Sequence, residues 1–468
     1  MSTPRETYSG FQVRTFRVRA DEGPGSLAKI VSMAAEVGFP VGDVRIVRGE
    51  PGGAVVRDFA FHVRGDSDLE TLCGRLRRIP GVELLEVLQD VLELRRGGVI
   101  ETQLRIPLES IADLRRVYTP GVAVACQRIQ ESPKCAYDYT HIGNKVAIVT
   151  NGTAILGLGD IGPLAGLPVM EGKAAIFRRF SGLSAEPVLI DSKDPKVVID
   201  VVEKIHLGFG AIQLEDIAAP ACFEVEEELE RRLGKPVLHD DQWGTATVVL
   251  AGLINSLRRI GRKPENVRAA ILGSGASGIA IARTLAGYGV GDVVLVDRAG
   301  AIHRGRADHM TDVKRELAEL TNKDDVRGGL SDVMKGRDLF IGVSVANQVS
   351  QDMVRSMAKD PIVFALANPV SEITIEDARD AGAAVALDGR AMNNALAYPG
   401  MFRGALDARA TRFTTSMKLA ASHAVATAAR GEELLPDMFD LSMHAGVAHA
   451  VAEAWRKSEG GVSPAERN

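Results

Sequence analysis

The chain has 468 residues, of which 25% are charged and 46% belong to the nine hydrophobic types, and its net charge is −5. This composition is typical of a globular protein of two or three domains and excludes an intrinsically disordered chain. A slightly acidic chain is not expected to bind nucleic acid or an anionic membrane surface. There is no apolar run of membrane-helix length, no signal-peptide core at the polar start, and no CxxC pair among the four cysteines. We therefore expect a cytoplasmic protein with reduced thiols.

The first region of the chain, residues 8–96, is predicted to form one small domain. Apolar and charged residues alternate at 16–20, which is the period of a half-buried strand, and a Pro-Gly-Ser start at 24–26 opens an amphipathic helix. Two further strand patterns, a second helix and a last strand follow, and this order predicts a ferredoxin-like split βαβ domain. The helix start and a later Pro-Gly-Val resemble those of ACT domains. The resemblance implies a regulatory or dimerising module with an amino acid or another metabolite as effector.

Two further domains are predicted after the Arg-Arg-Gly-Gly linker at 95–98. Residues 105–245 show a mixed α/β pattern with frequent Gly and Pro. Within residues 246–457, apolar strands alternate with helices, which favours a parallel sheet covered on both faces. The Ala-rich end, from 416 to 457, predicts helices that pack against the body or a second subunit. The predicted fold class is therefore α/β, with the ferredoxin-like domain followed by a mixed α/β domain and a Rossmann-type domain that ends in helices.

A dinucleotide fingerprint opens the last of these domains. A glycine-rich loop follows a strand and opens a helix, and Asp297 ends the next strand. In this context the loop backbone can approach a pyrophosphate, and the acidic side chain can bind the ribose hydroxyls. Asp297 favours NAD over NADP, although the neighbouring Arg298 leaves NADP open. The predicted cofactor-binding loop consists of Gly273, Ser274, Gly275, Ala276, Ser277 and Gly278.

A second glycine pattern, at 157–162, has the same spacing but is interpreted as a structural turn. Pro163 and Pro168 are expected to interrupt any helix after it. No strand that ends in an acidic residue follows at the distance that a dinucleotide site needs.

Two pairs of adjacent carboxylates follow apolar, strand-like segments: Glu215-Asp216 and Asp240-Asp241. Neighbours on a strand point to opposite faces, so the strand must end or bend at Glu215 if both side chains serve one site. Oxygen ligands without a Cys or His cluster suit Mg²⁺ or Mn²⁺ rather than zinc. Spacing alone leaves open whether these residues bind a metal or form two solvated acidic turns.

Lys173 and Tyr118 are candidates for proton transfer. Lys173 is flanked by apolar residues, and a lysine whose pKa is depressed by burial or by a metal ion can act as a general base. On its own, without further motifs, it is interpreted as an exposed helix lysine. Tyr118 stands before a Pro-Gly turn and could be either a proton donor or a core tyrosine.

Taken together, these segments resemble a malic enzyme of the shorter bacterial type. The matching segments occur in family order between about 105 and 411, and an ACT domain ahead of the catalytic part is a known arrangement in this family. They include residues 118–123, the long block 151–174, LEDI at 214–217, HDDQ at 239–242, the dinucleotide loop, ALANP at 365–369 and residues 393–407.

The resemblance implies oxidative decarboxylation of malate to pyruvate and CO2, with reduction of NAD or NADP. It implies that Glu215, Asp216 and Asp241 bind a divalent ion, Mg²⁺ or Mn²⁺, which in turn chelates malate. A homodimer or a larger homo-oligomer is expected.

The same resemblance assigns the remaining site residues. Lys173 would bind the substrate and take its C2 hydroxyl proton, and Asp240 would orient the lysine. Tyr118 would protonate the enolpyruvate carbon. Asn368 and Asn393 match positions that contact the substrate and the nicotinamide.

Four departures from the family pattern keep other functions open. Trp243 stands where His is usual, and Gln213 stands where Asn is usual. Val370-Ser371 follows ALANP where Val-Pro is usual, and the segment before Asn393 is shorter than in typical members. One alternative is a dehydrogenase of another 2-hydroxy acid that does not decarboxylate its substrate. A second alternative is a catalytically silent regulatory protein that binds NAD and a metabolite.

Overall fold

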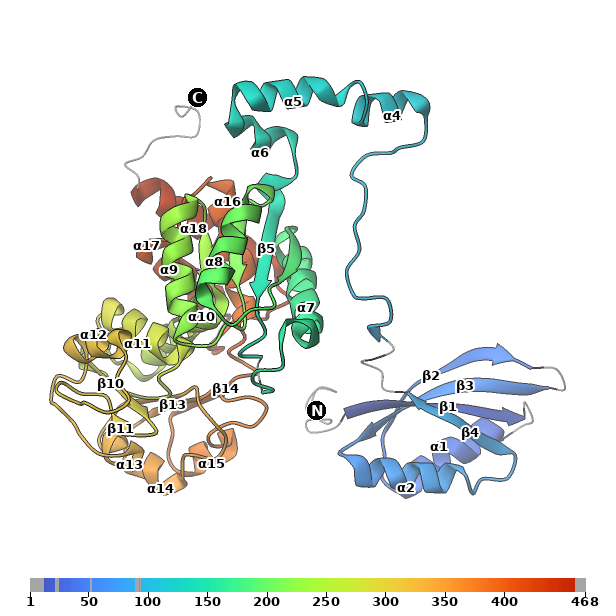
Figure 1. Cartoon of the computed structure of the whole chain (residues 1–468). Helices are drawn as coiled ribbons and strands as arrows, with labels where there is room; N and C mark the ends of the chain where they lie inside the picture. Colours follow the sequence, from blue (N-terminus) through green and yellow to red (C-terminus); the bar gives the residue numbers. More distant parts are fainter. Residues whose placement is uncertain are drawn as a thin grey trace. The chain divides into compact units, whose positions relative to one another are not determined.

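The structure is a computed structural model that describes residues 12–21, 25–50, 53–88, 92, 94–155 and 157–458. Contacts divide the chain into two compact units, Met1–Glu101 and Thr102–Asn468 (Figure 1). The first residues of the predicted 8–96 domain, Pro24 of the predicted helix start and most of residues 89–93 lie outside the described residues. None of the described helices is both long and apolar enough to cross a membrane.

The first unit has the predicted ferredoxin-like order of elements. Its antiparallel sheet has the strand order β2-β3-β1-β4. Both helices cover one face of the sheet, where Phe16, Phe59 and Phe61 pack against residues of the helices such as Ile30 and Leu72. The elements are β1 (Gln12–Asp21), α1 (Ser26–Glu36), β2 (Val41–Gly49), β3 (Ala54–Val63), α2 (Asp66–Leu76) and β4 (Val82–Leu88).

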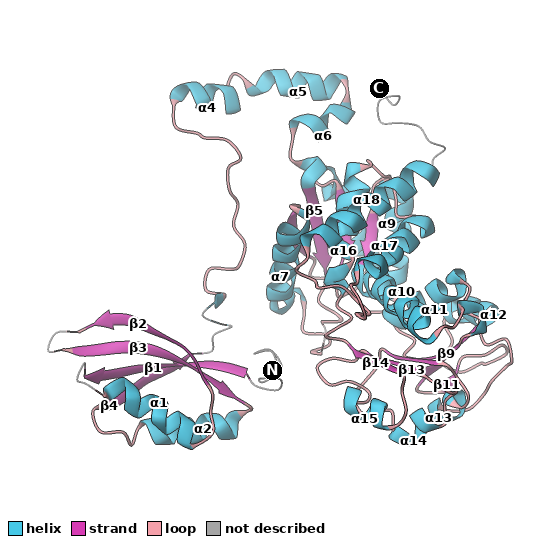
Figure 2. Cartoon of the chain, turned by 180° about the vertical axis from the view of Figure 1, so that it is seen from behind, coloured by secondary structure: helices cyan, strands magenta, loops and turns pink. Residues whose placement is uncertain are grey.

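The second unit begins with short helices that precede its first strand. Figures 1 and 2 show α4 and α5 leading away from the helices that cover the sheets of this unit. None of residues 102–140 is buried. The helices are α4 (Ile111–Val117), α5 (Val122–Glu131), η1 (Pro133–Cys135), α6 (Ala136–Tyr139) and η2 (Ile142–Asn144).

A four-stranded parallel sheet follows, with the strand order β6-β5-β7-β8. The prediction that Pro163 and Pro168 interrupt any helix after the 157–162 turn is wrong, because α7 starts at Pro163 and runs through Pro168. Pro163 occupies the first helical position, where a missing N–H costs nothing. The elements are β5 (Lys145–Thr150), α7 (Pro163–Ser181), β6 (Ser184–Leu189), α8 (Pro195–Ile205), η3 (His206–Gly208), β7 (Ala211–Leu214), α9 (Ala221–Leu233) and β8 (Val237–His239).

The second sheet of this unit has the predicted Rossmann-type order, β11-β10-β9-β12-β13-β14, and all pairs are parallel except β10 with β11. Helices cover its faces (Figure 2). Its strands are β9 (Arg268–Leu272), β10 (Asp292–Asp297), β11 (Gly300–Ala301), β12 (Leu339–Gly342), β13 (Ile362–Ala365) and β14 (Val385–Asp388). Its helices are α11 (Ala276–Tyr288), α12 (Asp312–Leu320), α13 (Leu330–Met334), α14 (Gln351–Arg355) and α15 (Ile375–Asp380), with η4 (Pro264–Asn266) before β9.

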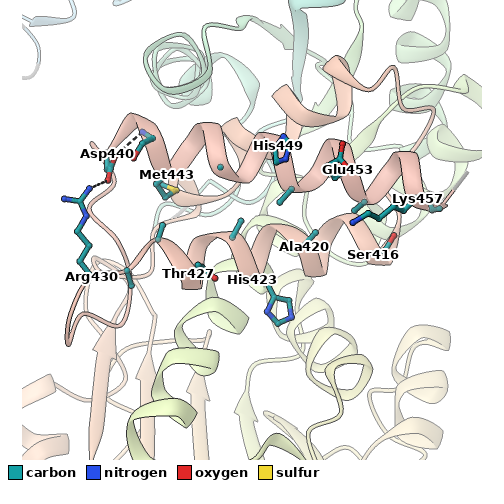
Figure 3. Close-up of a pocket in the computed structure, with 18 residues that line it drawn as sticks. Ser416, Ala420, His423, Thr427, Arg430, Asp440, Met443, His449, Glu453 and Lys457 are labelled. Carbon is teal, nitrogen blue, oxygen red and sulfur yellow. Dashed lines mark hydrogen bonds and ion pairs between the residues drawn. The ribbon is translucent and has the colours of Figure 1, made fainter. Parts of the chain in front are cut away.

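The long helix α10 (Asp240–Ile260) connects the two sheets. Side chains of both sheets share one hydrophobic core with it, so the predicted boundary at residue 245 lies inside a continuous helix. Three helices and one short turn complete the unit: η5 (Asn394–Leu396), α16 (Tyr398–Asp407), α17 (Thr415–Ala428) and α18 (Leu441–Ser458). A groove of about 1250 Å³ lies between α17 and α18, and many of the side chains that line it are small, such as that of Ala420 (Figure 3).

Candidate active site

The two carboxylate pairs meet at the carboxyl ends of neighbouring parallel strands. Glu215 and Asp216 directly follow β7, and Asp240 and Asp241 begin α10 directly after β8. The strand ends at Leu214, and Asp216 adopts a left-handed conformation with a φ of 52°. This bend places both Glu215 and Asp216 in one site, which a continuing strand would prevent.

Three of these carboxylates form a cluster that fits a hard divalent cation. Oxygen atoms of Glu215, Asp216 and Asp241 lie within 4.8 Å of one another. Burial raises the pKa of Glu215 well above its ordinary value, and burial together with Asp241 raises the pKa of Asp216 to about 7. The buried Oδ2 of Asp216 has no hydrogen-bond partner. Buried carboxylates that repel one another and lack a partner fit the all-oxygen ligand set of Mg²⁺ or Mn²⁺.

Lys173 lies directly beside this cluster. Its Nζ is 2.9 Å from Oε1 of Glu215 and forms an ion pair with Asp240, and it lies 4.8 Å from the ring centroid of Tyr398. The side chain is 16% exposed, so the exposed-lysine interpretation is wrong. Burial alone would lower the pKa of Lys173, but the charges of Asp240 and Glu215 outweigh burial and raise it. Burial, the first of the two causes considered from the sequence, therefore does not leave the pKa of this lysine depressed.

A network of polar groups holds Asp240 in place. Asn394 donates from Nδ2 to Oδ2 of Asp240 at 3.2 Å, and Thr245 donates to Oδ1 of Asn394 at 3.2 Å. Gly244 faces the same carboxylate, and a Cβ at this position would lie 2.0 Å from Oδ1 of Asp240. Asn394 and the buried Tyr398 were missed in the sequence analysis, although both lie in the matched block 393–407.

Trp243 contacts side chains of α9 and α17. Its Nε1 donates to Oε2 of Glu226 at 3.0 Å, and Nζ of Lys418 lies 3.2 Å from the centroid of its ring. Glu226 also accepts from the backbone N–H of His239 at 2.7 Å. The indole therefore belongs to a partly buried network that joins the start of α10 to α9 and α17.

The predicted dinucleotide loop has the expected geometry. It connects β9 to α11, whose first turn begins at Ala276. Gly273 has a φ of 117°, and a Cβ on Gly278 would lie 1.9 Å from the carbonyl oxygen of Gly273, so neither position accepts a side chain. Ser277 donates to the backbone carbonyl of Asp241 at 2.8 Å, which joins this loop to the carboxylate cluster.

Asp297 lies at the end of β10, where the ribose of a dinucleotide is bound in this fold. Its carboxylate accepts hydrogen bonds from Arg306 at 2.7 and 2.8 Å and from Lys314 at 2.8 Å. Burial would raise the pKa of Asp297, but the hydrogen bonds from these two cations outweigh burial and lower it. The sequence analysis singled out Arg298 and missed both, because their approach to Asp297 depends on the loop that follows β11.

The two asparagines predicted to contact substrate and nicotinamide lie in the second sheet's part of the chain, one after β13 and one before η5. Asn368 follows β13, and its Nδ2 donates to the carbonyl of Leu366 at 3.2 Å. Asn393 caps η5, accepting from the backbone N–H of Ala395 at 2.9 Å, directly before the Asn394 that contacts Asp240.

Tyr118 is the one predicted catalytic residue that the chain does not bring to the cluster. It is 67% exposed at the C-terminal end of α4. Figures 1 and 2 both show α4 well separated from α7, the helix that carries Lys173.

Comparison with known proteins shows the family of the chain. Residues 98–197 match the family model for the malic enzyme N-terminal domain, and residues 243–392 match the model for the malic enzyme NAD binding domain. The NAD-dependent malic enzyme of Geobacillus stearothermophilus is 42% identical over 450 residues, which cover 94% of this chain and 94% of that protein. The chain belongs to the malic enzyme family.

Other malic enzymes are similar to this chain in sequence and in fold. The bifunctional malic/malolactic enzyme of Bacillus subtilis (strain 168) is 48% identical over 367 residues, which cover 76% of this chain and 90% of that protein. The structure of the malic enzyme from Pyrococcus horikoshii Ot3 superposes with a TM-score of 0.77 at 40% identity, covering 79% of this chain and 91% of that chain. The NADP-dependent malic enzyme of Escherichia coli (strain K12) is 39% identical over 388 residues, which cover 77% of this chain and 51% of that protein, so the family relatives include enzymes of both cofactor classes.

Proposed function

We propose that this chain catalyses the metal-dependent oxidative decarboxylation of malate to pyruvate and CO2, with reduction of NAD or NADP. The observation that carries the proposal is the position of Lys173, which contacts both Glu215 of the carboxylate cluster and Asp240. The dinucleotide loop is joined to the same cluster through Ser277. The lysine, the carboxylate cluster and the dinucleotide loop therefore adjoin one another, which supports the roles of base, metal site and nicotinamide site.

The chain's own residues divide the reaction between them. Lys173 takes the proton of the C2 hydroxyl as the hydride leaves C2 for the nicotinamide, and Asp240 holds the amine in position. Asn368 and Asn393 contact the substrate and the nicotinamide. Tyr118 supplies the proton that completes pyruvate. A divalent ion held by the three carboxylates would offset the negative charge around Lys173 and stabilise the negative charge that develops on the substrate oxygen.

The test is the product ratio with purified enzyme, malate, Mn²⁺ and either nicotinamide cofactor. We expect one pyruvate for each NADH or NADPH formed, and Lys173→Ala should abolish both products. Lys196→Ala, on α8, is the matched control and should keep full activity. Reduced cofactor without pyruvate would instead favour the dehydrogenase that does not decarboxylate.

The first unit is proposed to regulate this reaction. Its ferredoxin-like fold is the one expected of an ACT-like module. Calorimetric titration of the full chain and of a chain lacking residues 1–96 with amino acids and small carboxylic acids tests this role. Heat that only the full chain produces supports it, and equal heat from the two chains contradicts it.

A further inference from the structure

The side chain of Gln213, in β7, contacts Glu215 of the carboxylate cluster. Gln213 is 0% exposed, and its Nε2 donates to Oε2 of Glu215 at 2.6 Å. The backbone N–H of Glu215 still donates to the carbonyl of Val149 in β5 at 2.9 Å, so the chain bends only after this residue. Residues two apart on a strand point to the same face of a sheet, which brings the amide and the carboxylate together.

The two oxygens of Glu215 therefore have two different donors. Oε1 lies 2.9 Å from Nζ of Lys173, and Oε2 accepts from the amide of Gln213. A carboxylate that is held at both oxygens has one orientation. The ammonium group of Lys173 is charged, whereas an amide donates without adding charge. The amide therefore fixes Glu215 and leaves more of its negative charge available to a cation than a second positively charged donor would.

The amide of Gln213 carries a cost that the fold alone does not explain. Its Oε1 is buried without a hydrogen-bond partner, and a buried acceptor left in this state costs about 1–3 kcal/mol. Of the ten such side-chain atoms found among the described residues, five belong to Gln213, Asp216, His239 and Asp240. These residues lie at or just after the carboxyl ends of β7 and β8. Unpartnered buried groups that gather in one place indicate a functional site, so we assign the amide a role there.

The other two carboxylates of the cluster are held through the backbone. Oδ2 of Asp241 accepts from the backbone N–H of Asp216 at 3.1 Å, and the carbonyl of Asp216 accepts from Ala154 at 3.0 Å. The orientation of Glu215, in contrast, depends on side chains. Mg²⁺ requires near-ideal octahedral geometry with oxygens at about 2.0–2.1 Å, whereas Ca²⁺ accepts about 6–8 oxygens at about 2.3–2.6 Å in variable geometry. A fixed carboxylate therefore favours the smaller ion.

We propose that Gln213 is a positioning residue that fixes the carboxylate of Glu215, and that it thereby sets the preference of the metal site for Mg²⁺ and Mn²⁺ over Ca²⁺. This inference rests on the proposed function of the site. Gln213 acts through Glu215 and is not itself a ligand. Lys173 cannot replace it, because the lysine contacts the other oxygen of Glu215 and has to accept a proton in the reaction.

Calorimetric titration of the metal-free full chain with Mn²⁺, Mg²⁺ and Ca²⁺ tests the proposal. Gln213→Met keeps the length of the side chain and removes the donor. We expect it to weaken Mn²⁺ and Mg²⁺ binding by about 10-fold or more, and Ca²⁺ binding by about threefold or less. Gln351→Met, in α14, is the matched control, because Gln351 donates at 2.7 Å to Asp377, a carboxylate outside the cluster. The control should bind all three ions as the wild type does.

Two results with Gln213→Met would overturn the proposal. One is unchanged affinity for Mn²⁺ and Mg²⁺, and the other is an equal loss for all three ions, which a merely structural role would produce. Gln213→Asn decides the question if Gln213→Met does not fold. It keeps a buried amide that is one methylene shorter, so it should show the same order of losses at a smaller size. A wild type that binds none of the three ions would instead end the proposed metal site, and this inference with it.

Discussion

Lys173 and Asp240 form an ion pair inside the site, and Asn394 donates to the same carboxylate oxygen at 3.2 Å. These contacts therefore hold the amine of Lys173 in one position. Asp240→Asn keeps the shape of the side chain but removes its charge, so we expect kcat to fall by about 100-fold with a small change in the KM for malate. Steady-state kinetics check this result. Asp312→Asn, at a fully exposed position, is the control, and a large change in KM with an unchanged kcat would contradict the positioning role.

Gly244 leaves no room for a side chain beside Asp240. In Gly244→Ala the new Cβ would lie 2.0 Å from Oδ1 of Asp240, so the carboxylate must move. We expect activity to fall as in Asp240→Asn and the free energy of unfolding to fall by about 1–3 kcal/mol. Gly287→Ala is the matched control, because no atom lies within 4 Å of its added Cβ on α11. If Gly244→Ala were fully active and fully stable, the start of α10 would have room for the added Cβ, which would contradict this prediction.

The indole of Trp243 is held by contacts outside the carboxylate cluster. Its indole contacts Glu226 and Lys418, so Trp243→His should leave kcat/KM for malate nearly unchanged. The loss of the contact with Lys418 should lower the free energy of unfolding by about 0.5–2 kcal/mol. Kinetics and thermal unfolding measure the two effects separately. A marked change in kcat or in substrate choice would instead place the indole in contact with malate.

Arg306 and Lys314 surround the carboxylate that was expected to favour NAD. Two cations at one acid leave a net positive charge where the 2′-phosphate of NADP would lie. We expect Arg306→Ala to lower kcat/KM for NADP by about 10-fold or more, mainly through KM, and to affect NAD less. Arg304→Ala, which removes an exposed ion pair with Glu319, is the control. Equal losses with both cofactors would show that Arg306 supports only the loop structure.

The elements with strong periodicity could be predicted from the sequence, and the contacts between distant elements could not. The ferredoxin-like order and the strand–loop–helix unit around Gly273 follow from local patterns, and the structure confirms both. The helix through Pro168 was excluded on local grounds but forms, because its buried face packs against β6 and α16. Local propensity is a weak guide where tertiary packing decides.

In the candidate site, too, the motifs could be predicted from the sequence and the contacts between distant residues could not. The matched motifs named Lys173 and the acidic residues, and the structure brings them together at one sheet edge. The raised pKa of Lys173 could not be foreseen, because it depends on charges that are distant in the chain. Asn394 and Arg306 act through contacts that only the folded chain creates.

The measurement that tests the central claim most directly is the calorimetric titration of the metal-free enzyme with Mn²⁺. We expect one tight site per chain, and Asp241→Asn should weaken it by about 100-fold or more, because a carboxylate ligand is lost. Asp437→Asn, far along the chain in an exposed turn, should bind Mn²⁺ as the wild type does. Equal affinity in Asp241→Asn and the wild type would contradict the assignment of Glu215, Asp216 and Asp241 as the metal site.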